Sequence, residues 1–556
     1  MLSQGHARHV ARVMAAPCLL LLVTFMLLVT TASAAPIPEI VARDGRYALM
    51  VDGAPFLILG AQTHNSSNYP AVLPKVWPAA QKLHANTVVI PVAWEQVEPR
   101  EGRFDFSFVD VLLQEARLQG FRLVLLWFAT WKNNGPSYAP EWVKLDNARF
   151  PRVITKDGRT LDSLSPHFRS TLEADRRAFT ELMRHLERVD EQRTVIMVQV
   201  QNETGTYGSA RDYSHTAEAA FRGRVPEELV RDLGLQGGDW QTVFGADADE
   251  FFHAWHIARY VDEVAAAGKA VYPLPMYANA ALRHPFTPGE PGSYSSGGPT
   301  DNVLAIWMSA APHLDMLSPD IYFRDHRIVT RVMELYARPG NPLYVAEIGN
   351  DRPFARWFFS AMGHGAIGFA PFGMDYSDYS NYPLGAERVA DETLLPFVEV
   401  YRLFARMERE WPRLAFEGRV WGVAEPDAPA GDEGETARVQ RLELGDWVAE
   451  VSYGRPMFGN PPPGGNDPPA GGAVIAELAP GEYLVAGLHA RVTFLPAREL
   501  GDRQMLLARV EEGRFEEGEW QFERVWNGDQ TDWGLNFSGQ PHLLKVRLAT
   551  YETGNR

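Results

Sequence analysis

Short, uniformly apolar segments alternate with amphipathic stretches from about residue 55 to residue 375. Strands that are buried on both faces of a parallel sheet have this near-continuous apolar character. Helices are predicted between them, because apolar residues recur three or four positions apart. We expect eight strands: Phe56–Gln62, Thr87–Glu95, Arg122–Trp131, Thr194–Glu203, Ala270–Asn279, Asp315–Tyr322, Leu343–Gly349 and Ala366–Phe372.

Eight alternations of strand and helix predict an α/β fold, a (β/α)8 TIM barrel. Its two longest connections cover residues 132–172 and 204–245 and follow the third and fourth strands. Both would lie at the carboxyl ends of the strands, where barrel enzymes carry their functional loops.

The pattern changes after a helix that is predicted near residues 387–411. Short, often alternating segments follow, separated by glycine, proline and aspartate, and this pattern is typical of an antiparallel β-sandwich. We therefore predict a barrel catalytic domain over residues 35–411 and a β-sandwich accessory domain over residues 412–556. We expect the sandwich to brace the barrel, because we find no row of exposed aromatic residues in it.

Residues 1–34 have the features of a secretory signal peptide. Arg8 and Arg12 precede the apolar run Leu19–Val29, and small residues at 32–34 form a cleavage site. The apolar run is too short for a membrane span. The sequence therefore predicts a secreted or periplasmic protein, from a Gram-negative bacterium, with no membrane segment after cleavage.

Charge and composition exclude several classes of partner. The chain has 53 Lys and Arg against 70 Asp and Glu, and a net charge of −17 argues against nucleic-acid binding. Its single cysteine, Cys18, lies in the predicted signal peptide, which excludes a disulfide framework or a cysteine metal site. No metal and no organic cofactor is expected, and the oligomeric state stays open.

Two predicted strands end on a glutamate. The fourth closes as Val198–Glu203 and the seventh as Leu343–Gly349, which contains Glu347. The ends of strands four and seven face each other across a barrel of this kind. Two facing acids can hydrolyse a glycosidic bond, because one protonates the leaving oxygen while the other attacks. We assign Glu203 as general acid/base, Glu347 as nucleophile, and Asn202 as a ligand of the sugar hydroxyl beside the anomeric carbon.

At these residues the chain resembles glycoside hydrolase family 35, whose typical members are β-galactosidases. The resemblance rests on the segments Trp94–Pro99, Gly102–Phe106, Val198–Glu203 and Tyr344–Glu347, and covers roughly residues 40–400. It is similar to the bacterial secreted branch with a β-sandwich tail, in which some members remove galactose from xyloglucan side chains. Family 42 β-galactosidases have a stretch similar to Trp94–Phe106.

The resemblance implies a retaining mechanism with two displacements. Glu347 attacks the anomeric carbon while Glu203 donates a proton, and Glu203 then deprotonates the water that releases the covalent intermediate. Such enzymes hold the two carboxyl groups about 5–5.5 Å apart. The pKa of Glu203 should be raised by burial and by the charge of Glu347. Tyr322 is expected to donate a hydrogen bond to Glu347.

Other residues near strand ends are candidates for carbohydrate binding. Aromatic faces stack on sugars and polar side chains read their hydroxyl groups. The candidates are Gln62, Glu95, Trp131, Asn133, Tyr277 and Trp307. The polar aromatic loop over residues 376–382, after the eighth strand, is expected to line the same cleft.

We therefore predict an exo-acting β-galactosidase that acts on a carbohydrate substrate. One alternative is another retaining glycosidase of the same clan, such as an endo-glucanase or an agarase, which would release mixed oligomers. The other is a non-catalytic carbohydrate-binding barrel, which would gain support if Glu203 and Glu347 lay far apart.

Overall fold

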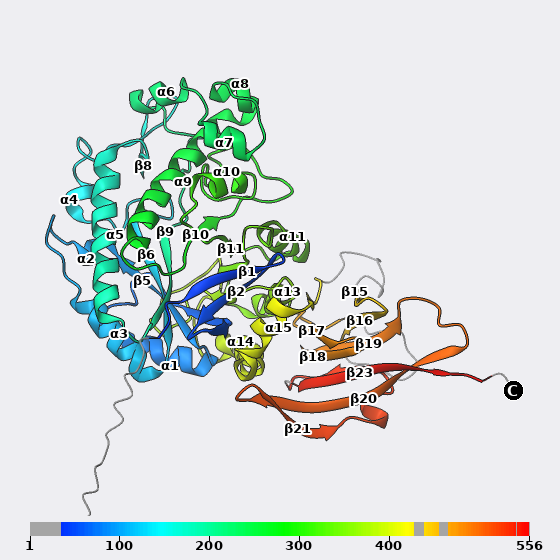
Figure 1. Ribbon diagram of the computed structural model, residues 1–556. Coiled ribbons are helices and arrows are strands. Elements are labelled where there is room, and N and C mark those ends of the chain that lie inside the picture. The colour runs from blue at the N-terminus through cyan, green and yellow to red at the C-terminus, as the bar shows by residue number, and fades with distance from the viewer. Residues whose placement is uncertain (1–34, 428–438, 455–464, 541, 555–556) are drawn as a thin grey trace, which may run out of the picture. The chain divides into compact units, whose positions relative to one another are not determined.

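A closed barrel of eight parallel strands forms the first part of the chain (Figure 1). The computed structural model describes residues 35–427, 439–454, 465–540 and 542–554, so the predicted signal peptide and Cys18 lie outside the described residues. The predicted barrel is confirmed. Its strands are β4 (Ile58–Gln62), β5 (Thr87–Ala93), β6 (Arg122–Lys132), β9 (Val195–Asn202), β10 (Met276–Ala281), β11 (Met316–Ile321), β12 (Tyr344–Ile348) and β13 (Gly368–Pro371).

Helices separate the barrel strands, and α3 is an example that buries one apolar face. In α3 the buried residues are Val109, Leu112, Leu113 and Ala116, and the helix ends at Gly120, whose φ of 78° is left-handed. The helices are α1 (Leu73–Leu83), α2 (Trp94–Val97), α3 (Ser107–Gln119), α4 (Glu141–Lys144), α5 (Arg169–Val189), α6 (His215–Phe221), α7 (Glu227–Asp232), α8 (Trp240–Phe244), α9 (Ala248–Lys269), α10 (Leu304–Ala310), α11 (His326–Tyr336), α12 (Arg352–Ala355), α13 (Trp357–Gly363), α14 (Asp391–Phe404) and α15 (Glu410–Glu417).

The fifth strand begins later than predicted. It was expected over Ala270–Asn279, but α9 runs to Lys269 and β10 begins at Met276. The segment between them contains Pro273 and Pro275, which have no backbone N–H to donate to a strand ladder.

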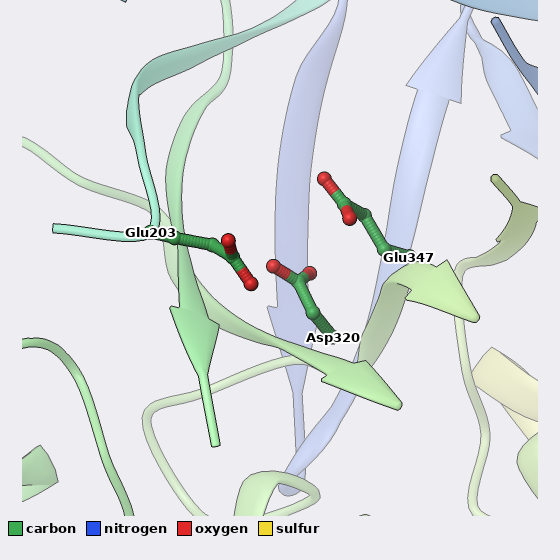
Figure 2. Close-up of side chains that lie close together, drawn as sticks. All are labelled: Glu203, Asp320 and Glu347. Atoms are coloured by element: carbon green, nitrogen blue, oxygen red, sulfur yellow. The ribbon is translucent and has the colours of Figure 1, made fainter. Parts of the chain in front are cut away.

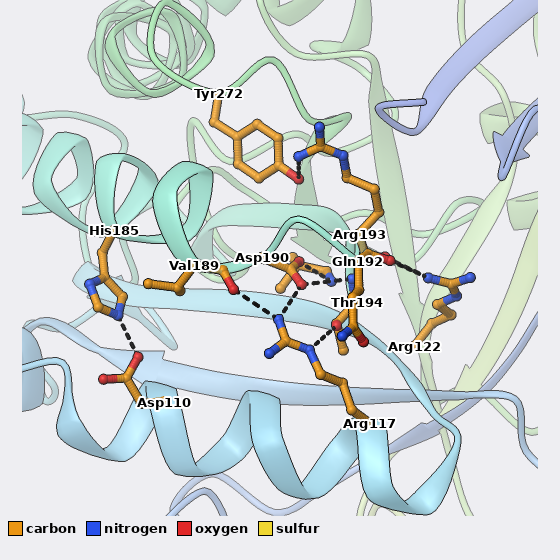
Figure 3. A network of polar contacts seen from close by, with 11 residues as sticks. Asp110, Arg117, Arg122, His185, Val189, Asp190, Gln192, Arg193, Thr194 and Tyr272 are labelled. Carbon is orange, nitrogen blue, oxygen red and sulfur yellow. Dashed lines mark hydrogen bonds and ion pairs between the residues drawn. The ribbon is translucent and has the colours of Figure 1, made fainter. Parts of the chain in front are cut away.

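A buried aspartate anchors the start of β9, the strand that leads to Glu203. Asp190, at the end of α5, accepts hydrogen bonds from the backbone N–H groups of Thr194 (2.9 Å) and Val195 (2.8 Å). Arg117 of α3 donates to Asp190 (2.7 Å) and to the Thr194 hydroxyl (2.8 Å), as Figure 3 shows. These contacts fix β9 against two neighbouring helices at the end opposite to its functional residues.

The loops at the carboxyl ends of the strands are long. The loop after β6 carries α4 and the hairpin of β7 (Arg152–Ile154) and β8 (Thr160–Leu164), and the loop after β9 carries α6, α7 and α8. A further connection, residues 282–303, follows β10 and was not singled out from the sequence. It packs so closely on the residues after β9 that a Cβ atom at Gly298 would lie 2.1 Å from the carbonyl oxygen of Thr204.

A small antiparallel sheet precedes the barrel and was not predicted. It contains β1 (Glu39–Arg43), β2 (Arg46–Val51) and β3 (Ala54–Phe56). Leu49, Val51 and Phe56 join one hydrophobic cluster with residues from inside the barrel. The segments of this sheet are too short to be recognised by alternation alone.

The C-terminal region consists of two antiparallel sheets, as predicted. Both contribute to one apolar cluster, in which Val451 and Val492 of one sheet meet Val485 and Leu544 of the other. The sheets contain β14 (Val420–Ala424), β17 (Gly472–Ala479), β18 (Glu482–Leu488), β23 (His542–Glu552), β20 (Arg503–Glu516) and β21 (Glu519–Val525), and β15 (Gln440–Glu443), β16 (Trp447–Tyr453), β19 (Ala490–Pro496) and β22 (Leu535–Phe537). None of the described helices is both long enough and apolar enough to cross a membrane.

Candidate active site

A cavity of about 580 Å³ opens where the barrel strands end. Several of its walls come from the connections that follow the strands. Its lining residues are Asn65, Lys132, Asn133, Glu203, Tyr207, Ala281, Leu282, Asp320, Tyr322, Phe323, Glu347, Phe372, Tyr379, Ser380, Asn381, Tyr382, Pro383 and Leu384. The loop after β13 therefore lines the cleft, as its aromatic residues led us to expect.

Three carboxyl groups meet in this cavity. Glu203 directly follows β9, Asp320 lies near the end of β11, and Glu347 lies near the end of β12. Asp320 and Glu347 are register partners on neighbouring strands, so their side chains leave the sheet at the same level. One carboxylate oxygen from each of the three lies within 4.8 Å of the other two, and Figure 2 shows the three groups pointing toward one another.

The backbone departs from strand geometry immediately before Glu203. Gln201 and Glu203 have left-handed φ values of 68° and 45°. Each such non-glycine residue costs on the order of 1 kcal/mol, so it needs support from its surroundings. Gln201 has that support, because its amide donates to the buried Asp175 (2.6 Å) and accepts from the backbone N–H of Trp131 (3.0 Å). The backbone N–H of Glu203 donates to Asn279 Oδ1 (3.0 Å).

Glu347 is surrounded by hydrogen-bond donors. Gln62 Nε2 (2.9 Å), Asn202 Nδ2 (3.2 Å) and Asn279 Nδ2 (3.5 Å) reach its Oε1, and the Tyr322 hydroxyl donates to its Oε2 (2.8 Å). Donors of this kind favour the ionised form of a carboxyl group. Glu347 is therefore held as a carboxylate in a fixed orientation, as a nucleophile requires.

Glu203 has the opposite environment. Burial and the negative charge of Glu347 raise its pKa to about 7, although Lys132 and a hydrogen bond with Asp320 act in the other direction. Burial, followed by the charges of Glu347 and Glu203, also raises the pKa of Asp320 well above its ordinary value. The cavity thus combines a carboxyl group held by four donors with two neighbouring acids whose pKa values are raised, and such a difference separates the roles of base and acid.

Six of the residues predicted to bind substrate or to support catalysis lie in or around this cavity. Gln62, Asn202 and Tyr322 contact Glu347 directly, as described above. Asn133 lines the cavity beside Lys132 and has a left-handed φ of 51°. Glu203 and Glu347, the two predicted acids, face the same space.

The other predicted substrate ligands are Trp131, Tyr277, Trp307 and Glu95. They do not line the cavity, so the prediction that they bind substrate is corrected. Trp131 is buried edge-on against Tyr260 (4.8 Å between ring centroids), and Tyr277 is buried against Tyr344 (5.3 Å). Trp307 lies in α10, where its indole donates to the carbonyl of Gly297 (3.1 Å).

These three aromatic side chains fill the interior because their apolar area is more favourably buried than exposed.

Glu95 is also outside the cavity lining. It lies in the short helix α2, not in a strand, and its carboxylate pairs with Lys144 Nζ (2.9 Å). The acid therefore holds a loop helix to its neighbour, and no contact joins it to Glu203 or Glu347.

Sequence reasoning missed Asp320 and Lys132. Asp320 lies within the apolar segment Met316–Ile321, and an acid inside a fully buried strand was a signal that could have been used. Lys132 is the last residue of β6 and supplies the positive charge that acts on both Glu203 and Asp320. Only the packed structure shows that these two residues meet the predicted acids.

Two family models match parts of the chain. The model of glycoside hydrolase family 42, described as beta-galactosidase, matches residues 75–255, and a domain of unknown function (DUF5597) matches residues 397–538. The matching model includes Glu203 but ends before Asp320 and Glu347.

Two β-galactosidases have similar sequences. The Xanthomonas manihotis enzyme "Beta-galactosidase" is 29% identical over 175 residues, which is 30% of this chain and 26% of that protein. "Beta-galactosidase 17" of Arabidopsis thaliana is 27% identical over 200 residues, which is 34% of this chain and 26% of that protein. The chain thus spans about a quarter of the length of these relatives.

The family model and both relatives are β-galactosidases, and each of them matches only part of this chain. These similarities support the predicted enzyme class, a glycoside hydrolase. The assignment to family 35 is not confirmed, because the model that matches is that of family 42. Among solved structures, the β-galactosidase from Bacillus circulans sp. alkalophilus has a TM-score of 0.46 and 15% identity, covering 65% of this chain and 57% of that one.

Proposed function

We propose that this protein is a retaining exo-β-galactosidase, which removes terminal β-linked galactosyl residues from oligo- or polysaccharides. The observation that carries the proposal is the pairing of Glu203 with Glu347 in one cavity. One acid has a pKa of about 7 and can donate a proton, while the other is held as a carboxylate by four donors. Glycosidic hydrolysis needs this combination.

In the proposed mechanism the Glu347 carboxylate attacks the anomeric carbon as its bond to the glycosidic oxygen breaks. Glu203 gives its proton to that oxygen, and a covalent galactosyl ester forms on Glu347. Glu203, now ionised, takes a proton from water while the water attacks the same carbon and releases Glu347. Asn202, which lies against Glu347, is placed to orient the neighbouring sugar hydroxyl.

The spacing of the two acids supports retention rather than inversion. Inverting enzymes separate their carboxyl groups by about 6.5–9.5 Å to hold a water molecule between them, whereas retaining enzymes keep them about 5–5.5 Å apart. Carboxylate oxygens of Glu203 and Glu347 lie within 4.8 Å of each other. The alternative of a non-catalytic carbohydrate-binding barrel would have gained support from widely separated acids. Because Glu203 and Glu347 lie close together, it gains none.

Similarity to β-galactosidases supports galactose as the sugar that is removed. The cavity supports its removal from the end of a sugar chain. Tyr207, Tyr379 and Tyr382 line it and are 48%, 63% and 67% exposed. Exposed aromatic faces suit stacking on the sugars of a leaving oligosaccharide. We infer that a galactosyl side chain of a polysaccharide such as xyloglucan enters the cavity, and that residues 1–34 direct the enzyme out of the cytoplasm.

The test is a panel of aryl glycosides followed by product analysis on oligosaccharides. We expect the β-galactoside to be cleaved fastest, galactose to be released singly from chain ends, and the β-anomer to appear first in a proton NMR time course. Mixed internal oligomers would indicate an endo-acting enzyme instead. An initial α-anomer would contradict retention, and binding without turnover would contradict the enzyme itself.

The pH dependence of the wild-type enzyme follows from Glu203. Its protonated form is the active one, so kcat/KM for an alkyl galactoside should fall tenfold per pH unit as the pH rises above about 7. The measurement is a pH profile in buffers of constant ionic strength. A rate that stays level from pH 6 to about pH 9 would contradict Glu203 as the acid.

A further inference from the structure

The proposed mechanism uses two acids, but the cavity contains a third that it leaves unexplained. Asp320 is only 3% exposed, and its strand β11 lies between β10 and β12. It is the register partner of Glu347 on one side and of Ala281 on the other. Its carboxyl group therefore projects into the same space as the two proposed catalytic acids.

The hydrogen-bond donors of the site show which carboxyl group carries the negative charge. Glu347 receives four donors, whereas Asp320 receives one, from Asn279 Nδ2 to its Oδ2 (2.6 Å). Among the described residues, no N–H or O–H group donates to Asp320 Oδ1, although this atom is buried. A buried carboxylate with so few donors beside another carboxylate is unfavourable.

The other charged and titratable groups around Asp320 do not make its ionised form more favourable than that of Glu347. Lys132 is the cation that acts on Asp320, and it acts on Glu203 as well. Tyrosines on neighbouring elements also feel the charge of Asp320, but each is a neutral group with a raised pKa: Tyr277, Tyr322, Tyr336 and Tyr344. In the part of the chain that the structure describes, one cation, Lys132, thus faces three carboxyl groups, and Glu347 has the donors that an ionised group needs.

Resting on the function proposed above, we propose that Asp320 is a positioning residue that works as a neutral carboxylic acid. It donates a hydrogen bond to Glu203 and holds Asn279 in place. Asn279 Nδ2 donates to Asp320 Oδ2 while Asn279 Oδ1 accepts from the backbone N–H of Glu203 (3.0 Å). Asp320 is thereby connected to both the side chain and the backbone of Glu203.

This role has a consequence in each displacement step. When Glu203 transfers its proton to the leaving oxygen, the new carboxylate needs a donor, and among the described residues no amide or hydroxyl reaches it. The Asp320 hydroxyl supplies that donor and keeps its own proton. The hydrogen bond lowers the pKa of Glu203 against the effect of Glu347, so that Glu203 still exchanges a proton with sugar and water.

The test compares Asp320→Asn with Asp320→Ala in the full-length enzyme. The amide of the first variant can donate to Glu203 and accept from Asn279 just as a neutral acid does, so kcat/KM for the best aryl glycoside of the panel should stay within about threefold. The alanine variant should lose about 100-fold. Its alkaline limb should also move to higher pH, because Glu203 has lost a hydrogen bond that lowers its pKa.

A matched control is Asp446→Asn, which changes an exposed aspartate of the C-terminal sheets that pairs with Arg498 (3.1 Å). It should leave kcat/KM unchanged. Three results would overturn the inference: an asparagine variant as slow as the alanine variant, wild-type rates in both, or a slow alanine variant whose pH profile is not displaced. In the first case, inactivation of the wild type by EDTA would identify a cation bound by the three acids.

An infrared measurement separates this inference from the proposed function, because it needs no substrate. The difference spectrum of wild type minus Asp320→Asn at neutral pH should contain the band of a protonated carboxyl group. Carboxylate bands alone would show that Asp320 is ionised and would overturn the proposal. An enzyme that shows the protonated band but cleaves no galactoside would refute only the proposed function.

Discussion

Glu347→Gln is expected to lower the turnover of an aryl β-galactoside by about 10⁴-fold or more while the protein stays folded. Glutamine has almost the same volume, and its amide oxygen can still accept from Gln62 Nε2 and Asn202 Nδ2. It cannot form the ester that the first displacement requires. The measurement is steady-state hydrolysis together with the thermal unfolding midpoint of both proteins.

The control variant is Glu228→Gln, since Glu228 lies exposed on α7 and does not line the cavity. Azide provides a second check with Glu347→Ala, because the truncated side chain leaves room for a small anion beside the anomeric carbon. Azide should restore turnover of an activated galactoside and yield the α-galactosyl azide. Normal hydrolysis by a folded Glu347→Gln enzyme would remove this residue from the role of nucleophile.

The barrel was predictable because burial on both faces leaves a simple signature. The segments that became β5, β6 and β9 are almost entirely apolar and are separated by helices with one apolar face. The first sheet and β21 gave no such signal. β21 has mostly exposed residues at the edge of its sheet, so burial imposes little pattern on it.

The two glutamates were predictable for a topological reason. Both follow buried strands, and the carboxyl ends of parallel barrel strands meet at one face, so Glu203 and Glu347 had to come near each other. The raised pKa of Glu203 and the hydrogen bond from Tyr322 to Glu347 were expected, and both are present. The donors from Gln62 and Asn279 were not expected, because tertiary packing directs their amides toward Glu347 from other strands.

The substrate ligands were harder because residue type does not reveal the direction of a side chain. Trp131 and Asn133 are two positions apart, yet Trp131 is buried against Tyr260 and Asn133 lines the cavity. β6 and β9 change register between Trp127 and Lys132, and this irregularity breaks the alternation that would have assigned their faces. Asp320 was missed for a related reason. Its strand β11 is fully buried, so its sequence suggested core packing and did not show that one side chain enters the cavity.

Glu203→Ala is expected to separate substrates by the quality of their leaving group. Without the acid, an alkyl galactoside or a natural disaccharide should lose about 10³-fold in kcat/KM, because its leaving oxygen needs a proton. A dinitrophenyl galactoside should keep a kcat/KM near that of the wild type, since its leaving group departs as a stable anion. The same variant should accumulate the galactosyl ester on Glu347, because Glu203 also activates the water of the second step.

Two measurements distinguish this role from simple damage to the site. Azide should accelerate breakdown of the ester and give the β-galactosyl azide, the opposite anomer from that expected with Glu347→Ala. The alkaline limb near pH 7 should vanish from the profile of the variant with the activated substrate, because the titrating group is gone. Glu228→Ala is the matched control, and it should change kcat/KM only slightly and by the same factor for both substrates. Equal losses on good and poor leaving groups would contradict the assignment, since they would show that Glu203 holds the sugar and does not protonate the departing oxygen.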